Sequence, residues 1–73
     1  MKFYDYKDYT IYPTPRYSTE SGKWKIHLTI RCKTKYKIFI NNNSFNTEYE
    51  AVFNCIQYGK QLIDEGRVIF DQA

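Results

Sequence analysis

Hydrophobic and polar residues alternate strictly along residues 23–32. Every second position is apolar, at Trp24, Ile26, Leu28, Ile30 and Cys32, and the positions between them are basic or polar. Successive side chains of a β-strand point to opposite faces of a sheet, so the pattern predicts a strand with one face in the core and the other in water. The face in water is basic, because it carries two lysines, a histidine and an arginine.

Two other segments, residues 6–13 and 35–41, show the weaker alternation of further strands. The later segment carries Ile38 and Ile40 on one face. Because an apolar face favours the core, matching it to the preceding strand places Ile30 opposite Ile38, with a bulge or a three-residue turn between the strands. A two-residue turn would instead place Ile30 opposite a lysine. We therefore expect Ile38 and Ile40 to lie in the core.

Apolar residues at steps of three and four after residue 50 predict a helix. Thr47 and Glu50 have the spacing of a capping box at its start, and Gly66 lies where a left-handed residue closes a helix. Gly59 in the middle costs about 1 kcal/mol relative to alanine, which indicates a close approach to the sheet. For the short apolar segment 67–71, three alternatives stay open: a fourth strand, a cover over the core, or a contact with another subunit.

These elements predict one α+β domain over residues 1–73. We expect a three-stranded antiparallel sheet in the order strand, strand, strand, helix, with a short C-terminal fourth strand as an option and one helix packed on one face. Residues 13–22, which contain two prolines and a glycine, are expected to form a polar loop. A chain of this size buries only about 60% of its unfolded surface, so association into a homodimer would stabilise it.

Charge is divided along the chain. Residues 22–47 carry six lysines and arginines and no acidic residue, whereas residues 48–73 carry five acidic and two basic residues. A basic sheet and an acidic helix suit an anionic partner. Two alternatives stay open, namely that the charges only keep the domain soluble, or that the helix of one copy faces the sheet of another.

The sheet face away from the helix is the candidate site. We expect it to carry aromatic and basic side chains together, at Tyr12, Lys25, His27, Arg31, Lys37 and Phe39. Aromatic rings stack on bases and cations neutralise phosphates. The sequence therefore predicts a non-catalytic module that binds nucleic acid or another polyanion. The alternative is a protein-interaction module, a homodimer or a partner-binding domain, that uses the same face.

The residue inventory argues against other functions. The sequence contains no glycine-rich phosphate loop and no nucleophile turn, and with one histidine and two cysteines it offers no zinc-ligand set free of carboxylates. We expect no catalytic residue, metal, cofactor or small-molecule substrate, and free thiols at Cys32 and Cys55 that point into the core. No apolar run approaches the about 20 residues of a membrane span, and the opening Met-Lys-Phe-Tyr-Asp lacks the apolar stretch of an export signal. We therefore expect a cytoplasmic protein without a membrane partner.

The order of these motifs resembles a group of small uncharacterised bacterial β-β-β-α proteins. The motifs that carry the resemblance are the Tyr9-x-Ile11 strand, the strand led by Trp24, and the helix limits Phe45-x-Thr47-x-x-Glu50-Ala51 and Leu62-Ile63-Asp64-x-Gly66. The segment around Thr47 is also similar to the strand-to-helix transition of HicB-like antitoxin domains, and the element order is similar to the latter part of double-stranded RNA-binding domains. The resemblance implies a bacterial protein but assigns no activity and no residue role.

Overall fold

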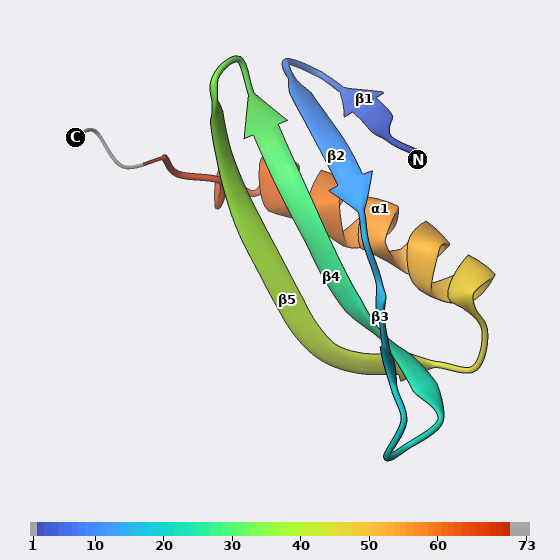
Figure 1. Cartoon of the computed structure of the whole chain (residues 1–73). Coiled ribbons are helices and arrows are strands. Elements are labelled where there is room, and N and C mark those ends of the chain that lie inside the picture. Colours follow the sequence, from blue (N-terminus) through green and yellow to red (C-terminus); the bar gives the residue numbers. More distant parts are fainter. Residues whose placement is uncertain (1, 71–73) are drawn as a thin grey trace.

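Five antiparallel strands form one sheet, and a single helix crosses one face of it (Figure 1). The computed structural model describes residues 2–70. The elements are β1 (Tyr4–Tyr6), β2 (Tyr9–Pro13), β3 (Arg16–Ser18), β4 (Lys23–Cys32), β5 (Lys35–Phe45) and α1 (Glu48–Asp64). The predicted α+β class, an antiparallel sheet followed by one helix, is confirmed, and the sheet has two strands more than the three predicted.

Both additional strands lie in the N-terminal part of the chain. The segment predicted as one strand over residues 6–13 contains the end of β1, a turn and β2. Lys7 in this turn has a positive φ of 55°. The predicted polar loop over residues 13–22 contains β3. This strand pairs with the first residues of β4, and β2 pairs with later ones, so both flank the same side of β4 because β5 occupies the other side.

The predicted register between β4 and β5 is wrong by one residue. A two-residue turn joins Cys32 to its partner Lys35, which places Ile30 opposite Lys37. Since partners across an antiparallel pair share a face, the slip turns Ile38 and Ile40 out of the core. The physical reason is the position of α1, which packs mainly over β4 and β2 and covers little of β5 (Figure 1). Burial therefore does not determine which face of β5 points inward.

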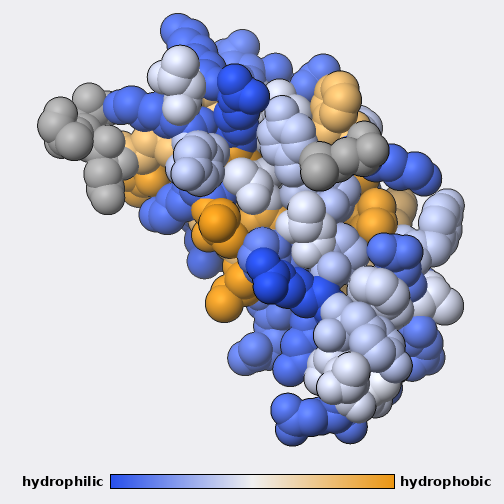
Figure 2. All heavy atoms as spheres, in the orientation of Figure 1, coloured by the Kyte–Doolittle hydropathy of each residue, from blue (hydrophilic) through white to orange (hydrophobic). Residues whose placement is uncertain are grey.

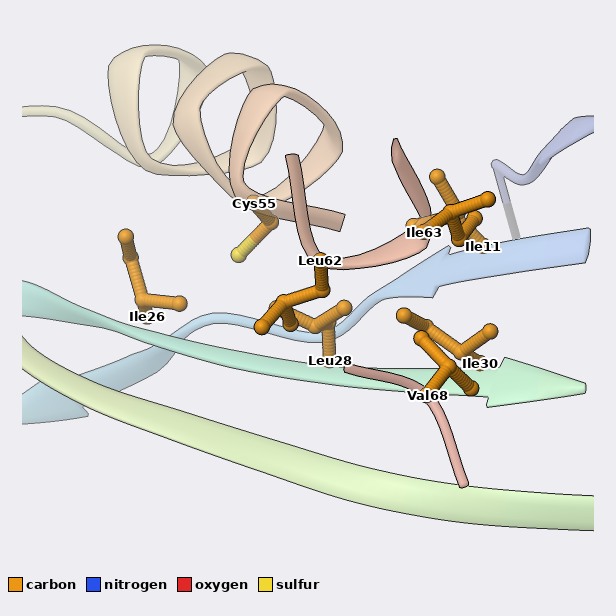
Figure 3. Packing of buried hydrophobic residues seen from close by; sticks show 8 residues of the cluster. All are labelled: Ile11, Ile26, Leu28, Ile30, Cys55, Leu62, Ile63 and Val68. Atoms are coloured by element: carbon orange, nitrogen blue, oxygen red, sulfur yellow. The ribbon is translucent and has the colours of Figure 1, made fainter. Parts of the chain in front are cut away.

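The core lies between α1 and the sheet. Figure 3 shows the apolar side chains of the strands directed toward those of the helix and of the segment after it, from Ile11, Ile26, Leu28, Ile30, Cys55, Leu62, Ile63 and Val68. The expected close approach at Gly59 is confirmed, because a Cβ atom there would lie 2.9 Å from Cδ1 of Ile11. Cys55 is fully buried, Cys32 is half-buried on the same side of the sheet, and both thiols are free.

Both predicted helix ends are confirmed. Oγ1 of Thr47 accepts a hydrogen bond from the backbone N–H of Glu50 at 3.1 Å, which satisfies one of the free donors of the first turn. Gly66 has a φ of 68°, and the N–H groups of Gly66 and Arg67 donate to the carbonyls of Ile63 and Leu62. This pair of bonds is a Schellman motif, which needs the left-handed conformation that glycine adopts at little cost.

The segment after the helix covers the core. Val68 is buried there, and the ring of Phe70 stacks on that of Tyr9 with centroids 6.5 Å apart. Residues 67–70 are not a strand, so the proposed fourth strand is not found in the part of segment 67–71 that the structure describes. Residue 71 lies outside the described residues.

Candidate functional site on the open sheet face

The sheet face opposite α1 is covered by no described element, and we call it the open face (Figure 1). Strand β4 places Lys25, His27, Thr29 and Arg31 on it, since these alternate with the buried residues of the strand. Tyr12 of β2 lies opposite Thr29 and shares this face. Figure 2 views the open face and shows hydrophobic side chains over β5 among hydrophilic ones.

The structure brings four of the six predicted site residues together. Tyr12, Lys25, His27 and Arg31 lie on the open face, as predicted. The prediction is wrong for the two residues of β5, Lys37 and Phe39, because the two-residue turn places them on the helix side.

Lys37 and Phe39 make their contacts on the helix side of the sheet. Phe39 packs against the core, and the Lys37 ammonium lies 5.9 Å from the centre of the Phe39 ring. Nζ of Lys37 also donates to the backbone oxygen of Ile69 at 3.4 Å. Lys37 therefore contacts the segment after the helix, Phe39 packs on the core, and neither contributes to the open face.

Residues of β5 that the sequence placed in the core stand on the open face instead. The exposed fractions are 67% for Tyr36, 53% for Ile38 and 71% for Ile40. Tyr36 lies opposite Arg31, and Ile40 lies opposite His27. The face of these residues depends on the length of the turn after Cys32. The sequence gives no sign of a two-residue turn there, because the turn contains no glycine or asparagine. Lys33 provides the positive φ, 59°, that a short hairpin turn needs.

Phe3 and Arg16 also join the face. The ring of Phe3, 58% exposed, lies 5.9 Å from that of Tyr12, centroid to centroid, at an interplanar angle of 41°. Arg16 of β3 lies directly opposite Lys25. Sequence reasoning missed Arg16 because a three-residue strand between a proline and a polar turn carries no periodic signal.

The open face is positively charged and its cations lack acidic partners. Arg16 and Lys25 are like charges on adjacent strands, an arrangement that destabilises a sheet mildly. Within residues 2–70 the ion pairs join Lys7 to Asp64 and Arg67 to Glu65, away from this face. The Arg31 guanidinium donates from Nε to the carbonyl of Lys33 at 2.8 Å, which directs it along the β4–β5 turn and leaves its other donors free.

One carboxylate reaches the open face. Asp5 of β1 lies opposite Thr10, and its Oδ1 accepts a hydrogen bond from the Thr10 hydroxyl at 2.9 Å. Since Thr10 also lies opposite Arg31, this carboxylate sits toward one end of the face. The strand positions of Arg16, Lys23, Lys25 and Arg31 therefore give the face an excess of positive charge.

His27 of β4 fixes the link between β2 and β3. Its Nδ1 lies 2.8 Å from the Thr14 hydroxyl, and its backbone oxygen accepts the N–H of Thr14 at 2.8 Å. Partial burial lowers the pKa of His27, and the nearby Arg16 guanidinium lowers it further. The imidazole is therefore neutral near pH 7, and its role is to fix the chain between β2 and β3.

A second polar cluster joins β1 to the end of α1 on the helix side. The Asp64 carboxylate accepts hydrogen bonds from Nζ of Lys7 at 2.7 Å and from the Tyr6 hydroxyl at 2.9 Å. These two bonds, the one from Lys7 first, lower the pKa of Asp64, and the same contact raises the pKa values of Lys7 and Tyr6. Asp64 places a negative charge at the C-terminal end of α1, which is the negative end of the helix dipole. The bonds from Lys7 and Tyr6 compensate this unfavourable position. We assign the cluster a structural role.

Residues 2–70 contain no cluster of potential metal ligands and no helix that could span a membrane. In this part of the chain no three histidine, cysteine, aspartate or glutamate side chains gather closely enough to hold a metal ion. None of the described helical residues forms a span long and apolar enough to cross a membrane.

Comparison of the chain with protein-family models, with curated proteins and with solved structures gave no match. The resemblance to bacterial β-β-β-α proteins, HicB-like domains and double-stranded RNA-binding domains stays a prediction.

Proposed function

We propose that the protein is a non-catalytic module that binds single-stranded nucleic acid, or a polyanion of similar charge spacing, through its open face. The observation that carries the proposal is the set of cations without acidic partners, Arg16, Lys25 and Arg31, around exposed aromatic rings on an uncovered sheet. Such a surface combines the two elements of single-strand binding, a cationic track for phosphates and rings on which bases stack.

The positions of the cations support an extended ligand. Lys25 and Arg31 lie six residues apart on β4, about 20 Å at roughly 3.3 Å per residue. Tyr12 and Tyr36 lie toward the Arg31 end of this line, on the two strands that flank β4. A sheet surface also suits separated bases better than a duplex, whose bases are stacked on each other.

A protein partner is the second candidate. The observation in its favour is the exposure of Ile38 and Ile40, because neighbouring apolar side chains on a surface are typical of protein interfaces. Salt separates the two candidates, since phosphate binding weakens steeply as salt rises whereas an apolar interface is unaffected or strengthened.

The experiment is a titration of labelled single- and double-stranded oligonucleotides at several salt concentrations. If Arg16, Lys25 and Arg31 each neutralise one phosphate, log K against log salt should have a slope of about −2 for single strands, at roughly −0.7 per contact. Lys25→Gln should make this negative slope shallower by about 0.7 and weaken binding for every base sequence. Tyr12→Leu should weaken binding by about 1–3 kcal/mol if a base stacks on the ring.

Lys37→Gln is the matched control, because it removes the same charge from the opposite face. Its affinity should stay close to that of the unchanged protein. Equal losses of affinity from Lys25→Gln and Lys37→Gln would mean that binding depends on net charge and not on the open face. No binding of either oligonucleotide at low salt would refute the proposed function.

A further inference from the structure

Strand β5 is a free edge of the sheet. It is the longest strand, Lys35–Phe45, and it pairs with β4 along one side only, so it forms the outer strand in Figure 1. No described strand pairs with its other side. A long edge strand with apolar side chains presents free N–H and C=O groups to another chain, and proteins usually block such an edge with prolines, bulges or charge. The bulge of β5 lies beyond Asn41, so its pairing with β4 is regular over residues 35–41.

The hydrogen-bond pattern shows which residues face the free edge. The carbonyl of His27 accepts the N–H of Thr14, so His27 directs its backbone groups toward β2. Pro13, which has no N–H, lies opposite Leu28, as expected if Leu28 directs its groups the other way, toward β5. Backbone groups alternate in direction along an antiparallel strand. The residues opposite Leu28 and Ile30, namely Phe39 and Lys37, therefore bond to β4.

It follows that Tyr36, Ile38 and Ile40 direct their N–H and C=O groups to the free edge. These are the same residues whose side chains stand exposed on the open face. Ile38 is the middle one of the three, with Tyr36 on one side and Ile40 on the other. An antiparallel pair of two β5 strands centred on Ile38 would match Ile38 with itself and Tyr36 with Ile40, and would form on the order of six backbone hydrogen bonds.

The charges and the bulge of β5 together favour this register over its neighbours. Centred on Ile38, the pairing places Lys37 opposite Phe39 of the second copy and leaves no like charges opposed. A shift of two residues that centres the pair on Lys37 would place Lys37 of one copy opposite Lys37 of the other. The opposite shift would carry the pair into the bulge after Asn41, where the ladder is irregular.

We propose that two copies of this chain associate through their β5 edges, antiparallel and with Ile38 at the two-fold axis, into one continuous sheet. Aromatic and β-branched partners across such a pair stabilise it. Face-to-face docking of two open faces is disfavoured, because it would bring Arg16 and Lys25 of both copies together. The inference does not depend on the proposed function, and edge pairing places both open faces on the same side.

The test is the oligomeric state of the full chain, free of nucleic acid and under reducing conditions, by sedimentation velocity over a concentration series. The unchanged protein should dimerise. Ile38→Lys places two ammonium groups at the axis and should raise the dimer dissociation constant about tenfold or more, without loss of the helix signal in circular dichroism. Ile38→Val should retain the dimer, because it keeps a β-branched side chain and all backbone groups.

Thr29→Lys is the control for the face, because Thr29 lies beside Ile38 on the open face but in β4, one strand in from the free edge. It should leave dimerisation unchanged, and dissociation equal to that of Ile38→Lys would refute edge pairing. If Ile38→Lys does not fold, amide exchange of the unchanged protein decides. The N–H groups of Ile38 and Ile40 should exchange more slowly as concentration rises. Exchange independent of concentration, or a monomer throughout the series, would overturn the proposal.

Discussion

Replacing one isoleucine in each of two neighbouring strands by alanine tests the β4–β5 register directly. Ile30 of β4 is fully buried, whereas Ile38 of β5 is 53% exposed. The register expected from the apolar pattern would pair these two residues in the core, and the observed register pairs Ile30 with Lys37. The two substitutions are chemically identical, so a difference between them reports only the environment of each side chain.

The expected magnitudes follow from burial. Ile30→Ala removes the equivalent of three carbon groups from the core, about 2.4 kcal/mol at roughly 0.8 kcal/mol each. The cavity left among Ile11, Leu28 and the helix adds to this loss, so the free energy of unfolding should fall by about 2–5 kcal/mol. At Ile38 about half of the surface is already in water and no closed cavity forms, so we expect a loss of about 1 kcal/mol.

Urea unfolding followed by circular dichroism measures both losses. A fixed low protein concentration keeps association from contributing to stability, and an unchanged m-value shows that only stability has changed. Phe39→Ala completes the set and should cost more than Ile38→Ala, because the ring packs against the core. If Ile38→Ala costs as much as Ile30→Ala while Phe39→Ala is nearly neutral, the observed register is incorrect.

Two further predictions concern the helix. Gly59→Ala should gain about 1 kcal/mol of helix propensity but lose about 1–3 kcal/mol to the clash with Ile11, so the unfolding midpoint in urea should fall. In an Ile11→Val background, which lacks the nearest atom Cδ1, Gly59→Ala should cost less, and an equal cost in both backgrounds would contradict the packing argument. Asp64 has a pKa below its usual value of about 3.9, so the stability it contributes is present above about pH 4 and is lost as pH falls through the lower, folded-state pKa. Thermal unfolding below pH 4 should therefore show a smaller acid loss in Asp64→Asn than in the unchanged protein, and identical pH profiles would mean that the Lys7 contact contributes nothing.

Local sequence determines the elements whose signals lie within a few residues. The alternation from Trp24 to Cys32 specifies one wet and one buried face of β4, and both are observed. Thr47 and Gly66 determine where the helix begins and ends, because capping is a contact between neighbouring residues. Gly59 indicates a close approach because glycine in a helix interior costs about 1 kcal/mol relative to alanine and usually has a packing reason. On the site, the same alternation identifies Lys25, His27 and Arg31.

Tertiary structure decides what periodicity leaves open. Alternation shows that Ile38 and Ile40 share a face, but which face is buried depends on where the helix lies, and α1 covers β2 and β4 rather than β5. β3 is likewise defined by its partner in β4, since three residues between prolines and a polar turn carry no period of their own. Arg16 reaches the open face only through that pairing. The physical reason is that side-chain direction is local, whereas burial is a property of the surfaces that meet.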